Sequence, residues 1–573
     1  MKNKKIILFF LLAFSFMIGL NSCKKESFNI NQDPNNATDS TVAYNTILPS
    51  ALDNTARIVA TPWGWLQNYL GYWSRSGTYA PSTEEETYQI TTNFQSGIWS
   101  QVYDNLYDYE LMRKSAEVSG AFMYEGIARI MKAHDFAILV DLYGNVPYSD
   151  AFKGSTTSPT PKYDNGFEIY KDLFRQIDTA IDHIKNADNS KNAEIATDDV
   201  MFGLKNFPST GSSNSVINAM KVRWAKFGNT LKLRMLTKFM NGGVEFNSSG
   251  SIGSIEKIAN NYNVQSEINA IETEGSGFLD FDAEVNPGYQ ADKGNPFFNS
   301  YVEDNSGVAT GNSVYYKANE FAVPNENTAS GGGGFYQWDA DTREGAFYTT
   351  VPNTNRYRGV TYGSPASTDF AASTLSGIGS GVYRGVDKPQ WIITAAESYF
   401  LQAECANRGY LTSVDPKGSL ETGILSSFLS LGLTSQDYND YYAYNSDPAV
   451  YVNPDVIYDA PEGSPDGAMG GLYTIITQKW FALNAIAPFE VWSDYRRIGI
   501  SDQAGVNHFI YGGPSAFFIE GPRISQSPSN TATEIPRRLL YPQREYLYNA
   551  ANVGAQPSSG AYPFNPVFWD VNN

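Results

Sequence analysis

Apolar side chains recur every three or four residues along much of the chain, which is the spacing of one face of an α-helix. Eight segments carry this pattern over enough length to form amphipathic helices. Because several of them are joined by short connections, we predict antiparallel helix pairs, stacked as in helical-repeat proteins. The fold class is therefore mostly α-helical. The eight segments are residues 46–69 (interrupted near Pro62), 94–118, 121–140, 166–185, 216–240, 391–408, 420–431 and 478–499.

Residues 241–388 do not follow this pattern. Gly, Asn, Ser and Tyr dominate there, and residues 331–334 are four consecutive glycines. A stretch of this length without helical periodicity is too long for an ordinary loop. It is either an irregular insertion or a lobe that binds a ligand. Residues 71–89 and 437–467 are also predicted to be loops.

The segment 478–499, QKWFALNAIAPFEVWSDYRRIG, combines an aromatic stripe with a charged end. Pro488 lacks a backbone donor and disfavours the α conformation of the preceding residue, so we expect two helical pieces or a kinked helix. Its acidic and arginine side chains are predicted to form ion pairs inside the helical scaffold rather than a ligand site. These side chains are Glu490, Asp494, Arg496 and Arg497.

The first residues indicate export. Three lysines within residues 2–5 precede an apolar run at 6–20, and Leu20-Asn21-Ser22 leads to Cys23. A positive start and a short apolar run are typical of a secretory signal. The Leu three places before Cys23 is similar to a bacterial lipoprotein signal, in which that cysteine becomes the acylated first residue. An ordinary signal peptide is the alternative. The predicted divisions are a signal peptide (1–22), a polar tether (23–41) and a single helical domain (42–573).

Composition and charge limit the classes of ligand that the protein is expected to bind. The formal charge of −19 disfavours nucleic acid, whose phosphates require clustered basic residues, and disfavours adhesion to anionic lipid. Only two cysteines occur, so with Cys23 acylated no intrachain disulfide is expected; Cys405 is predicted to be a small buried residue. The 38 tyrosines help to make aromatic residues 14% of the chain, so many rings must lie near the surface, where they can stack on sugars or partners.

Catalytic and metal-binding patterns are sparse. The three histidines, His134, His183 and His508, form no pair with metal-ligand spacing, and no cysteine cluster accompanies them. No G-x-S-x-G or phosphate-binding glycine motif occurs. We therefore predict no metal, no cofactor and no enzymatic activity. Carboxylates are plentiful, so an anchored glycoside hydrolase with paired carboxylates is one alternative, and a helical-repeat scaffold for protein interactions is another.

Five stretches, taken in chain order, resemble the SusD/RagB family of nutrient-binding outer-membrane lipoproteins. They are DLYGNVPYSDAF at 141–152, WAKFGNTLKLRML at 224–236, ITAAESYFLQAECANRGY at 392–410, the segment 478–499, and IPRRLLYPQREYLYN at 535–549. Ala396 and Phe400 also match one piece of a tetratricopeptide repeat. The chain departs from the family near Pro488, where relatives tend to have a small polar turn.

The resemblance implies a scaffold similar to tetratricopeptide helix pairs, with irregular segments that carry the ligand. It also implies a lipid-anchored protein of the outer membrane that faces the cell exterior. Such a protein would capture an oligosaccharide, or a peptide, and deliver it to a SusC-like TonB-dependent transporter. It would not be an enzyme.

Candidate ligand-binding residues follow from the chemistry of sugars. A sugar ring stacks its apolar face on an aromatic side chain, and its hydroxyl groups bond to amide, carboxylate or guanidinium groups. Two loop segments supply both kinds of group, and Tyr289 is a weaker candidate. Partial burial of each ring under its own loop is the alternative. The candidates are Tyr72, Trp73, Arg75, Tyr79, Tyr289, Tyr336, Trp338 and Asp339.

Overall fold

The computed structural model describes residues 42–153, 159–246, 252–324, 334–338, 340–449, 452–453, 455–459, 470–501, 507–508, 524–556 and 563–571. The contacts of the chain group Tyr44–Asn573 into one unit. The predicted signal peptide, Cys23 and the tether fall outside the described residues.

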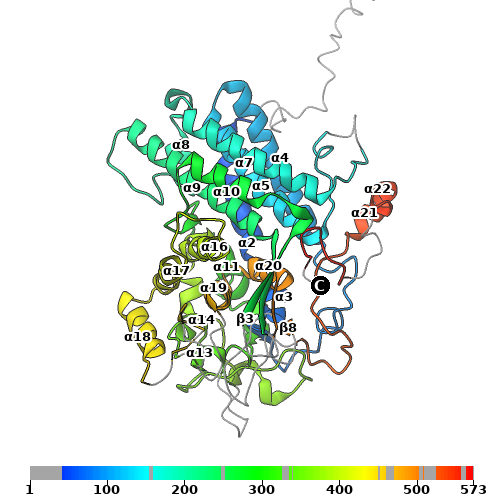
Figure 1. The fold of residues 1–573 in the computed structure, drawn as a ribbon. Coiled ribbons are helices and arrows are strands. Elements are labelled where there is room, and N and C mark those ends of the chain that lie inside the picture. Colours follow the sequence, from blue (N-terminus) through cyan, green and yellow to red (C-terminus); the bar gives the residue numbers. More distant parts are fainter. Residues whose placement is uncertain are drawn as a thin grey trace, which may run out of the picture. The chain divides into compact units, whose positions relative to one another are not determined.

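The first half of the unit is a layer of long helices. α5 packs against α4 on one side and α7 on the other, and α7 packs against α9. In Figure 1 these helices run side by side in blue-green colours, as the predicted antiparallel pairs require. The predicted interruption near Pro62 is confirmed, since one helix ends at Ala60 and the next begins at Gly64. The helices are α2 (Tyr44–Ala60), α3 (Gly64–Tyr69), α4 (Gly97–Ser119), α5 (Phe122–Tyr143), α7 (Gly166–Asn186), α8 (Ile195–Asp198), α9 (Ser213–Thr237) and α10 (Val264–Glu274).

Local sequence explains why α5 and α7 form and meet. The side chain of Asn165 caps α7 by accepting from the backbone N–H groups of Phe167 and Glu168. α7 then buries an Ile- and Leu-rich stripe and exposes its charged face. At the crossing, a Cβ atom on Gly126 of α5 would lie 2.6 Å from Cγ1 of Ile184. Glycine therefore permits the close approach of the two helices.

The second helical group lies in the C-terminal part of the chain. α16 packs on α17 and α19 around a core that includes Phe400, Ile424, Phe428 and Ile475. The predicted loop at 437–467 is wrong in its first part, which is helical in α18. Thr434 and Asp437 form a capping box that starts this helix in the Tyr- and Asn-rich segment. The group comprises α16 (Ala395–Asn407), α17 (Pro416–Ser430), α18 (Ser435–Ser446), α19 (Gly470–Leu483) and α20 (Pro488–Arg497).

The predicted break in 478–499 is confirmed. α19 ends at Leu483, and Pro488 occupies the first turn of α20, where its missing N–H is not needed. Ala485 has a φ of 59° between the two helices. The turn lets α20 change direction and bury both its aromatic and its charged side chains.

The segment 241–388 is not uniformly irregular. It holds α10, several short helices and strands of three small sheets. β2 pairs with β3 in an antiparallel hairpin and with β7 in parallel, β1 pairs with β5, and β4 pairs with β6. The strands are β1 (Trp73–Arg75), β2 (Met240–Phe246), β3 (Ile252–Ile258), β4 (Ala283–Val285), β5 (Tyr316–Ala318), β6 (Gln390–Ile393), β7 (Ile498–Ser501) and β8 (Asn507–His508). The short helices of this segment are α11 (Pro296–Tyr301), α12 (Gly311–Tyr315), α13 (Phe335–Trp338), α14 (Glu344–Phe347) and α15 (Ser380–Tyr383). Near the end of the chain, two more short helices follow, α21 (Gln543–Tyr548) and α22 (Ala550–Gly554).

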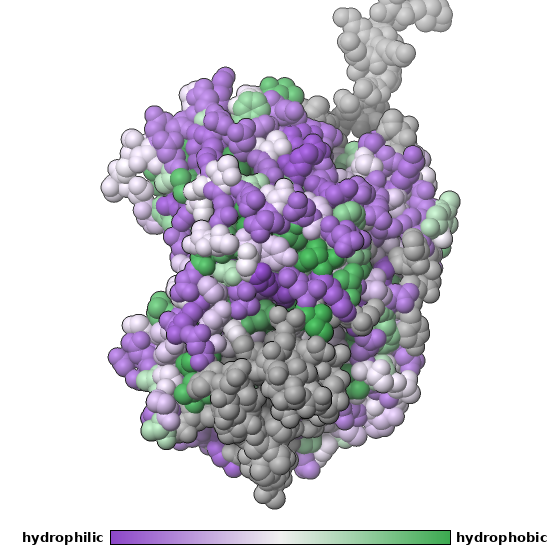
Figure 2. Space-filling view, viewed as in Figure 1, coloured by the Kyte–Doolittle hydropathy of each residue, from purple (hydrophilic) through white to green (hydrophobic). Residues whose placement is uncertain are grey.

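The predicted mostly helical fold, built from helix pairs, is confirmed by this arrangement. Over the helical layer, the face in view in Figure 2 is mostly hydrophilic, in keeping with the chain's charge. Among the described residues, no helix combines the length and the apolar character that a bilayer crossing requires.

Candidate functional site

Tyr72 and Trp73, two of the predicted sugar-stacking residues, belong to the core. The hydroxyl of Tyr72 donates to the carbonyl oxygen of Trp480 at 2.7 Å, and the two rings stack with centroids 4.6 Å apart. Trp73 is 1% exposed and packs against Tyr301 and Tyr316. The expectation that these rings face solvent is therefore corrected. Trp73 begins β1, all three residues of which are buried, and Tyr72 directly precedes that strand.

Arg75 ties loops together. Its Nε atom lies 2.5 Å from Oε1 of Glu86, and both side chains are buried. Its Nη1 and Nη2 atoms donate to the carbonyl oxygens of Tyr79 and Ser364, each at 2.6 Å. All of its main bonding directions are used within the protein, so in this structure it holds the 75–86 loop against residue 364 instead of facing a ligand.

Of the other predicted residues, Tyr289 and Tyr336 are buried inside the protein. The side chain of Trp338 and the whole of Asp339 are not among the described residues. Tyr289 donates to Asp53 at 2.9 Å, Tyr336 donates to the carbonyl oxygen of Phe481 at 3.0 Å, and both rings are buried. Trp338 ends α13, but its side chain and Asp339 fall outside the described residues. Their predicted role in binding stays a prediction.

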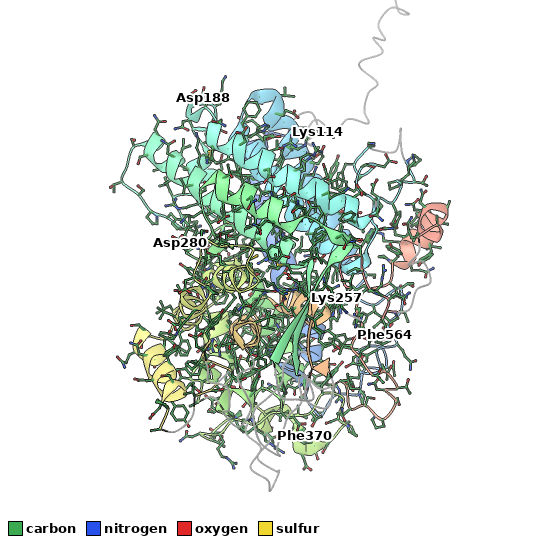
Figure 3. All side chains as sticks on the ribbon, viewed as in Figure 1. Lys114, Asp188, Lys257, Asp280, Phe370 and Phe564 are labelled. Atoms are coloured by element: carbon green, nitrogen blue, oxygen red, sulfur yellow. The ribbon has the colours of Figure 1, made fainter. Side chains whose placement is uncertain are left out.

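Tyr79 is half-buried, and it is the only one of the predicted rings with a described side chain that is. It contacts other aromatic residues that the sequence did not indicate. Its ring lies 5.1 Å from that of Tyr315 in an edge-to-face contact, and Tyr315 lies 4.9 Å from Tyr316. Phe370, labelled in Figure 3, is also half-buried, and its carbonyl oxygen accepts from the N–H of Gly77, two residues before Tyr79. We call Tyr79, Tyr315, Tyr316 and Phe370 the aromatic surface.

Three chain segments build the aromatic surface through backbone bonds. The β1–β5 register places Arg75 opposite Tyr316, and the N–H of Ser76 donates to the carbonyl oxygen of Tyr315 at 2.8 Å. The N–H of Gly77 donates to the carbonyl oxygen of Phe370 at 2.6 Å. A Cβ atom on Gly77 would lie 2.8 Å from that of Phe370, so glycine is needed for this close approach. Contacts across such sequence separations leave no local sequence signal.

Arg358 lies against the aromatic surface. Its guanidinium carbon is 5.1 Å from the centre of the Phe370 ring, and Nη1 donates to the carbonyl oxygen of Asp369 at 3.0 Å. Its Nε and Nη2 atoms are buried and have no hydrogen-bond partner among the described residues. These two atoms form one edge of the guanidinium fork, which matches two acceptor oxygens. The guanidinium group is thus held beside the Phe370 ring by its bond to Asp369.

Buried carboxylates beneath the aromatic surface are perturbed. Burial raises the pKa of Glu85 to about 7; the hydrogen bond from Asn68 opposes this shift, and the charge of Glu86 adds to it. Burial also raises the pKa of Tyr315, as do the charges of Glu85 and Glu86. The acidic side chains here are thus held below the rings, where they repel one another instead of facing a substrate.

The described residues contain no group of three or more His, Cys, Asp or Glu side chains that could hold a metal ion. His134 is buried with Nδ1 2.9 Å from Oδ1 of Asp135, and His183 lies 2.7 Å from Glu125. The side chain of His508 is outside the description. These two histidines serve helix packing.

Two family models match the chain. Residues 34–270 match a model described as "Starch-binding associating with outer membrane", and residues 336–559 match one described as "Susd and RagB outer membrane lipoprotein". Together these SusD-like models cover well over half of the sequence. The chain belongs to the SusD/RagB family. The resemblance inferred from the five sequence stretches is thereby confirmed.

Solved structures agree with the SusD/RagB fold. A chitin-binding SusD homolog from Flavobacterium johnsoniae is 20% identical with a TM-score of 0.62, over 91% of this chain and 98% of that one. A SusD homolog from Bacteroides fragilis is 18% identical with a TM-score of 0.64, over 93% and 100%. A SusD-like protein from Bacteroides thetaiotaomicron is 19% identical with a TM-score of 0.62, over 92% and 99%. The comparison with curated proteins gave no match.

Proposed function

We propose that this SusD/RagB family protein binds a glycan at the cell surface and delivers it to a TonB-dependent transporter of the outer membrane. The family models describe outer-membrane lipoproteins and starch binding, and one solved relative is described as chitin-binding. The glycan-binding site is proposed to be the aromatic surface together with Arg358.

The observation that carries the proposal is the contact of three half-buried rings, Tyr79, Tyr315 and Tyr316. The half-buried Phe370 joins them through the backbone bond from Gly77. Half-buried aromatic rings give up little further freedom when a sugar ring covers them, and their faces match its apolar C–H groups. Arg358 adds a guanidinium group beside the Phe370 ring, of the kind that bonds sugar hydroxyl groups. Tyr79 is the one residue shared by the sequence prediction and this surface.

A binding experiment tests the site. The purified protein is screened on a glycan array that includes chito-oligosaccharides and malto-oligosaccharides, and the best ligand is titrated by calorimetry. We expect the double variant Tyr79→Ala/Tyr315→Ala to weaken binding about tenfold or more, because it removes two stacking faces. The matched control is Tyr444→Ala, since Tyr444 is 58% exposed on α18. Equal affinity of the double variant and the control would refute the proposed site.

Membrane attachment and delivery are tested separately. We expect metabolic labelling with a fatty acid to depend on Cys23, and Cys23→Ala to move the protein out of the membrane fraction. A large β-barrel protein is expected to co-purify with the anchored protein after mild detergent extraction. Recovery of the anchored protein without such a partner would count against delivery to a transporter.

We propose a binding role without catalysis. Near the aromatic surface, Glu86 is paired with Arg75 and the Glu85 carboxylate accepts from Asn68 at 2.6 Å; both carboxylates are buried. A glycoside hydrolase requires two carboxylates on either side of the scissile bond. Incubation with the bound glycan is therefore expected to release no new reducing ends, and their appearance would favour the hydrolase alternative.

A further inference from the structure

A second, basic pocket lies in the helical layer, away from the aromatic surface. α4, α5, α7 and the turn at residues 148–153 enclose a cavity of about 490 Å³. Figure 3 labels Lys114 of its wall and Phe370 of the aromatic surface at opposite ends of the unit. We call this cavity the basic pocket. Its charged lining residues are Glu110, Arg113, Lys114, Arg129, Lys132 and Lys153.

The lining of the basic pocket is mostly cationic, although the chain as a whole is acidic. The whole chain carries a formal charge of −19, yet the described residues that line the cavity include five cations and a single carboxylate. Glu110 contacts Arg113 through two bonds of 3.0 Å, Lys114 at 3.3 Å, and Lys132. Arg113 is also paired with Glu117 at 2.8 Å, a carboxylate outside the lining, so the lining itself carries more cations than carboxylates. The carboxylates that pair with Arg129 and Lys153 are not part of the lining.

Arg129 and Lys132 point the same way from α5. They are three residues apart, with Phe136 one turn further along the same helical face, and all three line the pocket. The side chains of Arg129 and Lys132 remain 17% and 20% exposed. Burial lowers the pKa of Lys132 against the opposing effect of Glu110. An anion that entered here would meet two cations already held in place by helix geometry.

Aromatic side chains complete the wall on the other side. Tyr148 and Phe152 line the cavity beside Phe136, and the ammonium group of Lys132 lies 6.0 Å from the centre of the Phe152 ring. Phe152 has a φ of 62°, which is unusual for a bulky residue. Backbone strain of this kind persists where the surroundings hold it and is concentrated at ligand-binding positions.

We propose that the basic pocket binds an anionic sugar, one or two rings that bear a carboxylate or sulfate group. Arg129 and Lys132 would bond the anionic group, since hydrogen bonds between ions are stronger than neutral ones, and Phe152 would stack on the ring. The cavity volume falls within the range of small-molecule sites, about 300–1,000 Å³. The inference goes beyond the glycan site proposed above and does not depend on it.

Calorimetry with matched sugars tests the ligand class. The probes are α-1,4-digalacturonate, its dimethyl ester and galactose 6-sulfate, at about 50 mM salt so that screening stays moderate. The ester keeps the sugar rings and removes the charge. We expect digalacturonate to bind the unmodified protein and the ester to bind about tenfold more weakly or worse. Binding of galactose 6-sulfate in place of digalacturonate would identify sulfate as the anionic group. Equal binding of acid and ester, or no binding of either anionic probe, would overturn the proposal.

Two variants and a matched control locate the binding. Lys132→Gln keeps a donor for Glu110 but removes the charge, and we expect it to weaken binding about tenfold. The control is Lys171→Gln, because Lys171 also pairs with a glutamate and also lies over a phenylalanine ring, but outside the pocket. Equal affinities of these two variants would overturn the proposal. A second outcome would also overturn the proposal: Tyr79→Ala/Tyr315→Ala loses digalacturonate binding while Lys132→Gln keeps it in full. The anion would then occupy the aromatic surface and not the basic pocket.

Phe152→Gly separates binding from folding. Glycine adopts the positive φ of residue 152 without strain, so the variant is expected to keep its melting temperature within a few degrees. We expect its affinity for the anionic sugar to fall at least fivefold, because the stacking face is gone. Unchanged affinity in a folded Phe152→Gly protein would overturn the assignment of Phe152.

Discussion

Replacing Asp494 by Ala should cost stability and leave glycan affinity unchanged. Asp494 lies in a buried ion network, where Oδ1 accepts from Nε and Nη2 of Arg497 at 2.9 and 2.5 Å. Its Oδ2 atom lies 2.9 Å from Nζ of Lys479. Arg497 also holds Glu404 through bonds of 2.5 and 2.6 Å. The segment that the sequence analysis singled out is thus tied into the scaffold at its charged end.

The magnitude follows from what remains after the substitution. Arg497 keeps Glu404, but Lys479 is 3% exposed and loses its ion-pair partner. Removing one member of a buried ion pair costs about 3–5 kcal/mol. An unfolding entropy of about 2.1 cal/mol/K per residue gives about 1.2 kcal/mol/K for 573 residues. The melting temperature should therefore fall by about 2–4 °C.

Urea unfolding and differential scanning calorimetry measure this loss, and calorimetric titration measures glycan affinity. The control is Glu168→Ala, which breaks an exposed ion pair with Lys171 near a helix start and should cost about 1 kcal/mol or less. If Asp494→Ala were no less stable than Glu168→Ala, the network would not stabilise the fold. If affinity fell while stability held, Asp494 would instead belong to a binding site.

Four further predictions concern buried groups. Burial acts to raise the pKa of Glu404, but the charge of Arg497 outweighs burial and lowers that pKa to about 2. The stability that ionised Glu404 contributes is present above pH 4.5 and should be lost as the pH falls toward 2. Glu404→Gln should therefore make the midpoint of urea unfolding less dependent on pH below 4.5. Burial raises the pKa of Glu85 to about 7, so the protein loses stability as the pH rises from 4.5 through 7. The free energy of unfolding of Glu85→Gln should therefore rise, relative to wild type, by up to about 3 kcal/mol between pH 4.5 and 8. A difference between the two proteins that did not change with pH would contradict the burial argument. Trp73→Ala should cost about 3–5 kcal/mol in urea unfolding, and a loss under 1 kcal/mol would contradict its place in the core. Burial raises the pKa of the Cys405 thiol, so in a Cys23→Ser background maleimide should label it only in denaturant; native labelling would show that it is accessible.

Helix periodicity predicted the scaffold because burial of one face of a helix imposes a pattern on neighbouring residues. The break before Pro488 was equally local, since one residue determines its own φ and removes its own donor. α18 was missed because its composition is polar and its start depends on the Thr434–Asp437 capping box. Short helix signals of this kind are easily outweighed by the Tyr, Asn and Pro residues around them.

The candidate site was harder to predict because its residues come together only through long-range pairing. The presence of aromatic residues near 72–79 was informative, but β1 turns Trp73 inward and leaves Tyr79 at the surface. Nothing local distinguishes these two rings. Tyr315 and Phe370 join the segment of Tyr79 through contacts more than two hundred residues apart in sequence, across the β1–β5 pair and the Gly77–Phe370 bond. Arg358 then joins through its contact with Phe370.

Asp141 at the end of α5 has a consequence for the time course of folding. Its carboxylate is fully buried and accepts from Tyr170 at 2.5 Å, Lys238 at 2.6 Å and Trp569 at 2.7 Å. Trp569 lies 428 residues further along the chain. During synthesis at about 5–20 residues per second, the early helices must therefore wait roughly 20–90 seconds for this last donor. An unfinished chain keeps an incompletely bonded carboxylate at the end of α5, so completion of the polypeptide is itself a step in closing the core.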